Sequence, residues 1–382
     1  MTRIPFYRHD LGAAEVASLA AALESPILTT GELVAQFERR FADTVGLPHA
    51  VGLTSCTGAL HLALAGLGIG AGDDVVTTPL TFVATATAIL QAGARPIFAD
   101  VEPDTGNLDV ARLEAALTAR TRAVIPVHLF GQMCDMRALR ALADRRGLRV
   151  VEDAAHCVEG ERDGVRPGAL GDAACFSFYA TKSLTSGEGG ALVTRDGALA
   201  ERVRLLRLHG MTSSAAERER DGYRPWDVVA MGWKYNMDNL QAALLLPQLD
   251  RLAENHARRT ALAMRYRERL AGLAGVTVPP VRPDQRHAWH LFTIRCATGT
   301  RDAVLTELMR AEVGVTVNYE PVHLTTHFRA AYGYEPGRFP VAERIGATSL
   351  SLPLYATMPE AHVDEVVTRL ARVLDGLAAT SR

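Results

Sequence analysis

The sequence predicts an α/β protein in which a large, mostly parallel sheet domain precedes a smaller C-terminal α+β domain. Between Ala50 and about Arg204, short apolar runs alternate with helical patterns, as is typical of a parallel sheet covered by helices. After Gly232 the pattern changes to a long helical stretch followed by short strands and helices. We therefore expect residues 1–245 to form the large domain, with an N-terminal arm, and residues 246–382 to form the small domain, entered by a long linking helix.

The strands and helices of the large domain follow from local patterns. Strands are expected where short apolar runs lie between turn residues, namely at Ala50–Thr54, Asp74–Thr77, Arg95–Ala99, Ala123–His128, Leu148–Glu152, Ala173–Phe178 and Ala191–Thr194. Helices are expected at Gly58–Leu67, Phe82–Ala92, Asp109–Ala119 and Met136–Arg146. Polar residues follow three strand ends, at Ser55–Gly58, Asp153–His156 and Ser177–Lys182. Ligands of such sheets bind at the carboxyl ends of the strands, so we expect these three sets to meet in one crevice.

The linking helix should run from Asn236 or Asp238 to about Leu270, interrupted by Pro247. In the small domain, strands are expected at Val276–Val278 and Leu291–Cys296, and helices at Ala303–Ala311 and Ala361–Leu374. Glycine and prolines between residues 275 and 283 mark the turns.

Composition excludes several classes of protein. The formal net charge is −2 and 48% of the residues are apolar, so a nucleic-acid or membrane partner is not expected. Residues 1–11 lack the apolar core of a signal peptide, and no run approaches the ~20 apolar residues of a membrane span. The five cysteines are scattered and never spaced as C-x-x-C, which argues against a disulfide framework and a zinc site. We expect a cytoplasmic protein without a metal.

Lys182 is the only cation in a polar turn between an apolar strand and the glycines at 187, 189 and 190. A lysine in a loop is ordinarily a solvated charge. Here an ammonium held between a core strand and a glycine turn would be partly desolvated, which disfavours its charged form. Such an amine is a candidate for covalent bonding to a carbonyl compound.

Three other positions have both a structural and a functional interpretation. Small residues near Thr57 and Gly58 can cap a helix, or their N–H groups and the helix dipole can hold a phosphate. Asp153 can be a helix cap, or it can pair with a protonated ring nitrogen of a cofactor. Phe82 can belong to the core, or it can cover an aromatic ring. The glycine run at 66–72 follows a helix, so it does not fit a dinucleotide fingerprint, and a nicotinamide dehydrogenase is disfavoured.

Taken in order, the motifs resemble those of the DegT/StrS family of nucleotide-sugar aminotransferases, which are fold-type I pyridoxal 5′-phosphate (PLP) enzymes. The resemblance covers essentially the whole chain. The matching segments are Ser55-Cys-Thr-Gly-Ala-Leu, Glu152-Asp-Ala-Ala-His, Phe176-Ser-Phe-Tyr-Ala-Thr-Lys, Gly187-Glu-Gly-Gly, His209-Gly, Gly232-Trp-Lys-Tyr-Asn-Met and Ser351-Leu-Pro-Leu.

The resemblance implies a role for each matching residue. Lys182 matches the lysine that binds the cofactor covalently, Asp153 the acid on the ring nitrogen, and His156 the residue beside the ring hydroxyl. The other cofactor contacts that it implies are Thr57, Gly58 and Ser177 at the phosphate, Phe82 on the ring, and Asn236 at the phosphate of the neighbouring subunit's cofactor. It therefore implies a homodimer with shared active sites.

The implied reaction is transamination of a nucleotide-linked ketosugar with L-glutamate as amino donor. Family members that dehydrate sugars carry histidine in place of the lysine, so Lys182 argues against that branch. The segments at 232–236 and 287–292 most resemble enzymes that aminate carbon 4 of UDP-linked ketosugars, including the aminoarabinose type.

Candidates to line the sugar side are His287, His290, Asn318, Tyr319 and His323, each of which can also be an ordinary polar residue. Two alternatives stay open: amination at carbon 3 of a dTDP-ketosugar or of a keto-cyclitol, and a PLP-binding regulator without catalysis.

Overall fold

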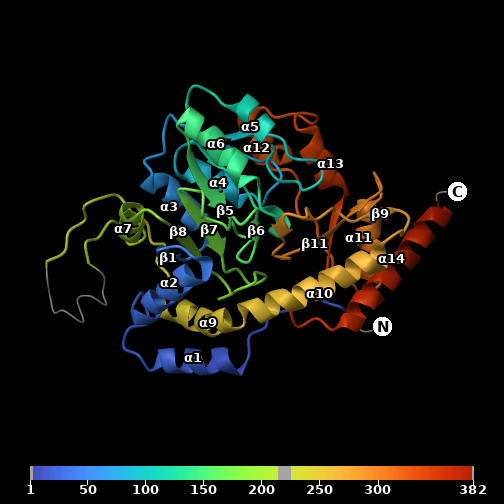
Figure 1. The fold of residues 1–382 in the computed structure, drawn as a ribbon, viewed down its shortest axis with the longest axis horizontal. Coiled ribbons are helices and arrows are strands. Elements are labelled where there is room, and N and C mark those ends of the chain that lie inside the picture. The colour runs from blue at the N-terminus through green and yellow to red at the C-terminus, as the bar shows by residue number, and fades with distance from the viewer. Residues whose placement is uncertain (1–2, 214–224, 381–382) are drawn as a thin grey trace.

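A seven-stranded sheet lies at the centre of the structure, a computed structural model that describes residues 3–213 and 225–380 (Figure 1). Its strands are β1 (His49–Leu53), β2 (Asp74–Thr77), β3 (Arg95–Phe98), β4 (Thr121–Ile125), β5 (Arg149–Asp153), β7 (Ala173–Ser177) and β8 (Gly190–Thr194). They run in the order β1-β8-β7-β5-β4-β2-β3. Only β8 is antiparallel to its neighbours, so the expected strands and the mostly parallel sheet are confirmed.

Alternate residues of the central strands pack against helices on opposite faces of the sheet. Val151 and Cys175 belong to the core under α3 (Cys56–Gly66), α4 (Ala84–Gln91) and α7 (Gly197–Leu206). Ala174 and Phe176 belong to the core on the other face, where α2 (Glu32–Val45) and α9 (Asn239–Asp250) pack. On that second face, α5 (Val110–Ala116) and α6 (Met136–Arg146) cover β2, β4 and β5. Burial on both faces explains why these strands are almost continuously apolar.

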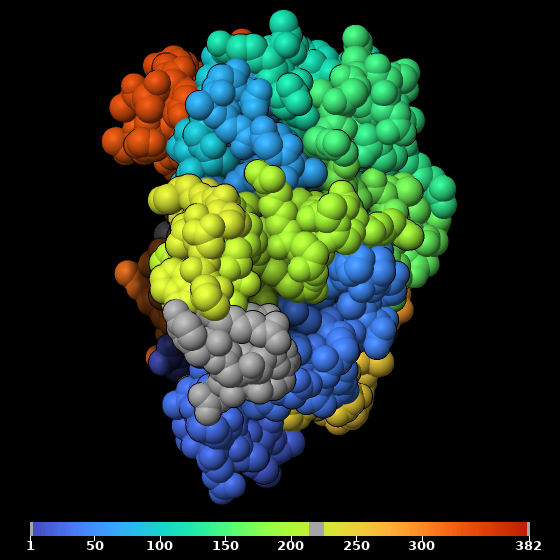
Figure 2. All heavy atoms as spheres, turned by 90° about the vertical axis from the view of Figure 1, so that its left-hand side faces the viewer, coloured from blue at the N-terminus to red at the C-terminus, as the bar shows by residue number. Residues whose placement is uncertain are grey.

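The N-terminal region contains two helices that the sequence reasoning did not identify. α1 (Ala13–Leu23) packs against α9, and α2 packs against both β1 and α9. Figure 2 shows α1 and α2 on the same face of the molecule as α7 and the segment that follows residue 224. Before α1, the chain crosses to the C-terminal part, where Ile4 bridges to Val313 and is buried.

The linking segment consists of two helices rather than one helix broken at Pro247. α9 continues through Pro247 to Asp250, and α10 (Leu252–Leu270) begins after Arg251, which has φ −108° and ψ 9°. Proline removes one helical N–H and can bend a helix without ending it. The expected division at 245/246 falls inside α9, whose apolar residues pack with the large sheet; the domain boundary stays a prediction.

The C-terminal part has a core of its own. A small sheet, β12 (Ser349–Leu352), β11 (Phe292–Cys296) and β9 (Val276–Thr277), packs with α10, α11 (Arg301–Arg310) and α14 (Glu360–Thr380). The remaining helices are α12 (Thr326–Tyr332) and α13 (Pro340–Thr348). None of the described helices is long and apolar enough to cross a membrane.

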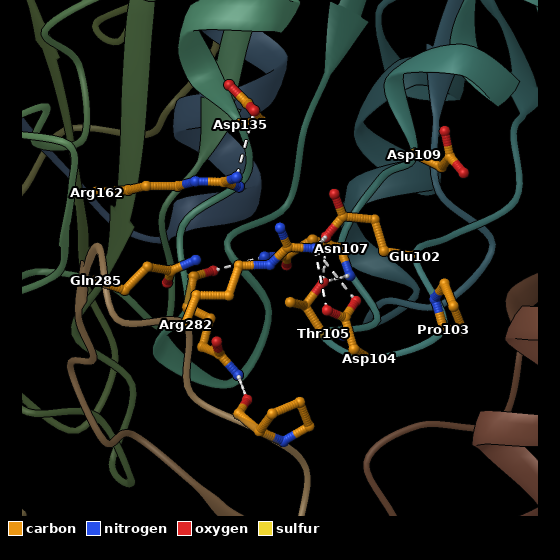
Figure 3. A network of polar contacts seen from close by, with 12 residues as sticks. Glu102, Pro103, Asp104, Thr105, Asn107, Asp109, Asp135, Arg162, Arg282 and Gln285 are labelled. Carbon is orange, nitrogen blue, oxygen red and sulfur yellow. Dashed lines mark hydrogen bonds and ion pairs between the residues drawn. The ribbon is translucent and has the colours of Figure 1, made fainter.

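Polar contacts join the C-terminal part to the loops of the large sheet (Figure 3). β6 (Glu161–Arg162) pairs with β10 (Gln285–Arg286). The Arg282 guanidinium donates to Glu102 at 3.3 Å and to Asp104 at 3.0 Å. These contacts hold the segment that leads to His287–Leu291 against the carboxyl ends of the sheet strands.

Candidate active site

The three polar sets that follow strand ends do lie at one edge of the sheet. Asp153 ends β5 and is paired in register with Cys175 of the neighbouring β7. Ser177 ends β7 opposite Gly190 of β8, and Gly190 is also paired with Leu53 at the end of β1, where α3 begins. The parallel β5 and β7 and the adjacent β8 therefore bring Asp153, Lys182 and the start of α3 together.

Lys182 lies in the loop between β7 and β8. Its Nζ is 3.4 Å from Nε2 of the buried His290, and its carbonyl oxygen accepts from the Tyr7 hydroxyl at 3.3 Å. Burial lowers the pKa of Lys182 to about 8, and electrostatic interactions with Cys56 and Asp153 partly oppose this decrease. Near physiological pH such an amine has a larger neutral fraction than an ordinary lysine, and the neutral amine is the nucleophilic form.

Asp153 is only 6% exposed. Its Oδ2 accepts from the Thr85 hydroxyl at 2.7 Å, and its Oδ1 accepts from the Ala155 backbone N–H at 3.2 Å. Burial raises the pKa of Asp153, while both of these hydrogen bonds and the charge of Lys182 oppose that rise. A protonated ring nitrogen beside this carboxylate would stabilise its charged form.

His156 is held as a neutral imidazole beside the crevice. Its Nδ1 accepts from the Phe130 backbone N–H at 3.3 Å, so the proton of the neutral ring is assigned to Nε2, which lies 3.2 Å from the Tyr319 hydroxyl. Burial, followed by the charge of Lys182, lowers the pKa of His156 well below its usual value. Phe130 adopts φ 61°, a left-handed conformation that directs its N–H toward the imidazole.

The start of α3 is packed closely against β8. The Ser55 hydroxyl accepts from the Gly58 N–H at 3.0 Å and caps the helix. A Cβ at Gly190 would lie 2.3 Å from the Ser55 carbonyl carbon, so only glycine fits. Thr57 and Gly58 lie in the first turn of this helix, and Ser177 lies opposite Gly190, as a cradle for a phosphate requires.

Phe82 lies just before α4 rather than within it, and its side chain is 58% exposed. Its ring centroid is 5.9 Å from that of Tyr319, which in turn contacts His156. Since an exposed phenyl ring is unfavourable in water, this position suits a side chain that covers a bound ring.

Asn236, which is expected at the neighbouring subunit's cofactor, and two of the sugar-side candidates lie outside the Lys182 cluster. Asn236 donates to the Thr30 hydroxyl at 2.7 Å and lines a separate cavity of about 820 Å³ bordered by α1, α2 and α7. His287 stacks on Trp289 with ring centroids 3.9 Å apart and lines a cavity that does not include Lys182. His323 is fully buried against Phe339, with its Nε2 3.0 Å from Glu343.

Of the five sugar-side candidates, His290 and Tyr319 therefore join the Lys182 cluster directly. Asn318 precedes Tyr319, and its Oδ1 accepts from the Ser351 hydroxyl at 2.8 Å.

Sequence reasoning missed four residues around the cluster. Thr85 carries the hydroxyl that binds Asp153, and Thr81, four residues earlier, bonds that same hydroxyl at 2.8 Å. The i, i+4 spacing of the two threonines near a strand end was the available signal. Tyr7 and Arg259 come from segments distant in sequence, and nothing local marks them.

These residues fit a cofactor that has a phosphate, a flat aromatic ring with a basic nitrogen, and an aldehyde. The α3 start and Ser177 would hold the phosphate, the buried Asp153 carboxylate would hold the ring nitrogen, and Lys182 would bind the aldehyde. Among the described residues, no group of three or more His, Cys, Asp or Glu side chains is arranged to hold a metal ion. The fold and this site define a PLP-dependent aminotransferase of fold type I.

Comparison with known proteins identifies the family. Residues 9–371 match the DegT/DnrJ/EryC1/StrS aminotransferase family, and the chain belongs to it. It is 44% identical over 379 residues to the spore coat polysaccharide biosynthesis protein SpsC of Bacillus subtilis (strain 168), covering 98% of this chain and 97% of that protein.

Two solved structures illustrate the similarity. S. venezuelae DesV, in complex with a ketimine intermediate, is 37% identical, with a TM-score of 0.90 and coverage of 97% of this chain and 98% of that one. DesI in the presence of its TDP-sugar product is 34% identical, with a TM-score of 0.87 and coverage of 99% and 94%. The protein is thus a PLP-dependent sugar aminotransferase, which requires a ketosugar and an amino donor.

Proposed function

We propose that the protein transfers the amino group of L-glutamate to carbon 4 of a nucleotide-linked ketosugar. The ketosugar gains the amino group and a hydrogen in place of its carbonyl oxygen, and glutamate leaves as 2-oxoglutarate. The observation that carries transamination is the partly buried Lys182 amine, whose pKa is lowered to about 8, within electrostatic range of the Asp153 carboxylate. We place this reaction in the cytoplasm.

Bound PLP supplies an electron-withdrawing ring that stabilises negative charge on the carbon from which a proton is removed. Lys182 would hold the aldehyde through its Nζ, and the same Nζ, once free, would be placed to carry a proton between the two carbons that exchange hydrogen. Asp153 keeps the ring nitrogen protonated. His156, whose neutral ring is oriented by Phe130 and Tyr319, lies beside the ring hydroxyl.

Thr57, Gly58 and Ser177 bind the phosphate, and Phe82 covers the ring. On the sugar side, His290 and Tyr319 have the strongest support because they contact Lys182 and His156. Asn318 has indirect support as the neighbour of Tyr319. The contacts of His287 and His323 do not support a place on the sugar side, since each ring is packed against other side chains.

We further propose a homodimer in which Asn236 of each subunit completes the site of the other. Asn236 Oδ1 is buried without a hydrogen-bond partner among residues 3–213 and 225–380. Exposed apolar side chains lie in the segment just before Asn236: Trp226, Val228, Val229 and Met231. Met231 is 81% exposed, and a second copy of the chain would bury such a surface.

The sugar position and the nucleotide are tested by incubating the purified protein with L-glutamate and a panel of UDP- and dTDP-linked 4-keto and 3-keto sugars, with product masses as the measurement. We expect an aminosugar from a UDP-linked 4-ketosugar. Product only from a 3-ketosugar or a keto-cyclitol would favour the first alternative. No turnover with any ketosugar, despite bound cofactor, would favour the regulator.

A further inference from the structure

A small cavity adjoins Lys182 on the side of α10 and the N-terminal segment. Its volume is about 30 Å³. The residues that matter to its chemistry are Tyr7, Lys182, Asn255, Arg259 and His290. A single water needs about 10–15 Å³ of such space, so the cavity holds roughly two water-sized groups. That is the size of one carboxylate, with its two oxygens, and far too small for a sugar.

Arg259 brings a buried and incompletely satisfied guanidinium to this cavity. It is 5% exposed, and its Nη2 donates to Glu159 at 2.5 Å and to the Ala288 carbonyl at 3.4 Å. Its Nε is buried without an acceptor among the described residues. Because an unpaired buried N–H is unfavourable, the guanidinium has capacity for a further acceptor.

Arg259 also acts electrostatically on His290, the residue next to the reacting amine. Burial and then the charges of Lys182, His156 and Arg259 lower the pKa of His290, the residue whose ring lies 3.4 Å from Lys182 Nζ. An anion in the cavity would therefore lie between or beside two cationic groups.

Both acids near the cavity bind a cationic side chain, although Glu159 Oε2 has no partner among the described residues. Asp10 accepts from Arg251 and from Asn255, each at 3.0 Å, and Glu159 accepts from Arg259. Arg8, the remaining charged residue of the lining, is exposed and adds positive charge at the surface. The surroundings thus favour an incoming anion over a cation.

We propose that Arg259 binds the α-carboxylate of the amino donor while the donor's amino group faces Lys182. The inference rests on the proposed transamination and restricts the donor to α-amino acids. Bidentate binding of a carboxylate is a property of arginine, and the cavity has room for one such group.

The first test uses wild-type holoenzyme and two ligands that differ only at this group. α-Methyl-L-glutamate has no α-hydrogen and cannot be turned over, and 4-amino-4-methylpentanoate is the same skeleton with a methyl group in place of the α-carboxylate, so it also has no hydrogen to lose. Calorimetry should show about 10- to 100-fold tighter binding of the first, the range expected for a charge-assisted hydrogen-bonded pair. Equal affinities would overturn the proposal without any variant.

The second test uses variants of the pair. Arg259→Gln leaves Glu159 as an unpaired buried charge and can impair folding, so the double variant Arg259→Gln/Glu159→Gln removes both charges together. The matched control is Arg258→Gln, since Arg258 is an exposed neighbour on α10 paired with Glu254. We expect the double variant to raise KM for L-glutamate about 10- to 100-fold and to lose the preference between the two ligands, with KM for the ketosugar unchanged.

A double variant with normal cofactor content that keeps the glutamate KM and the ligand preference would refute a role for Arg259. Failure of the wild type to aminate any ketosugar would refute the proposed function instead. The ligand comparison still decides the arginine's role in that case, so the two failures are distinguishable.

Discussion

The hydrogen bond from Thr85 to Asp153 provides a test of how the proposed catalytic carboxylate is held. Thr85→Val removes the hydroxyl but keeps the shape of the side chain. In the wild type this hydroxyl donates to Asp153 Oδ2 at 2.7 Å, and both residues are buried. A hydrogen bond to a charged buried group contributes about 1.5–3 kcal/mol, so its loss should weaken whatever depends on the charged carboxylate by about 10- to 100-fold.

The proposed pairing of Asp153 with the cofactor's ring nitrogen depends on the charged form of this carboxylate. The Thr85 hydroxyl lowers the pKa of Asp153, so its removal raises that pKa, and a larger fraction of the carboxyl is protonated at a given pH. We therefore expect the dissociation constant of PLP to rise about 10- to 100-fold. We also expect the acid limb of the kcat/KM profile to move to higher pH. Fluorescence titration of cofactor-free protein and a pH–rate profile measure these effects.

The control is Thr87→Val, two residues further along α4, where the hydroxyl bonds only the Ala84 carbonyl of its own helix. It should leave both quantities unchanged. If Thr85→Val binds PLP as the wild type does and keeps its pH profile, Asp153 does not depend on this hydroxyl and the reasoning fails.

Three further predictions concern other parts of the site. Because burial lowers the pKa of Lys182 from 10.5 to about 8, the unfolded chain binds more protons than the folded one between these pH values, and stability rises with pH. Cofactor-free Lys182→Met should therefore be more stable than cofactor-free wild type at pH 7, by at most about 3 kcal/mol. This difference in stability should decrease between pH 8 and pH 10.5, and thermal melts over this range measure it. Gly190→Ala should destabilise the protein by about 1–3 kcal/mol and weaken PLP binding, because its Cβ would overlap the Ser55 carbonyl carbon. The control Gly376→Ala, which has open space at its Cβ, should not destabilise the protein. Equal melting temperatures for the two variants would contradict the packing argument. Mixing inactive Lys182→Ala and Asn236→Ala chains should restore part of the activity if sites are shared between subunits, and no recovery on mixing would argue against sharing.

The sheet was predictable because its strands are buried on both faces. Such strands appear in the sequence as nearly continuous apolar runs, as in Val150–Val151 and Ala173–Phe176, and the polar residues that follow them mark the binding edge. α1 and α2 were not recognised. α1 is rich in alanine, and only Glu15 and Ala22 of its residues are buried, so its sequence carries little helical periodicity.

The histidines show where sequence reasoning stops. His287 and His290 are three residues apart, yet one stacks on Trp289 and the other approaches Lys182. Trp289 between them has φ 50°, a left-handed conformation that turns the chain and separates the two side chains. No property of the residue type distinguishes the two positions beforehand.

The sequence by itself determined the strands of the large sheet and the residue types at their ends, because both follow from local hydrophobic patterns and short motifs. It thereby predicted Lys182 and Asp153 as site residues. Only the tertiary structure decided which distant groups surround them, such as Thr85 on the Asp153 carboxylate and Arg259 and Tyr7 at the lysine. Their positions depend on how α4, α10 and the N-terminal segment pack across the sheet edge, and the direction of a side chain after such packing is not encoded in the spacing of its own segment.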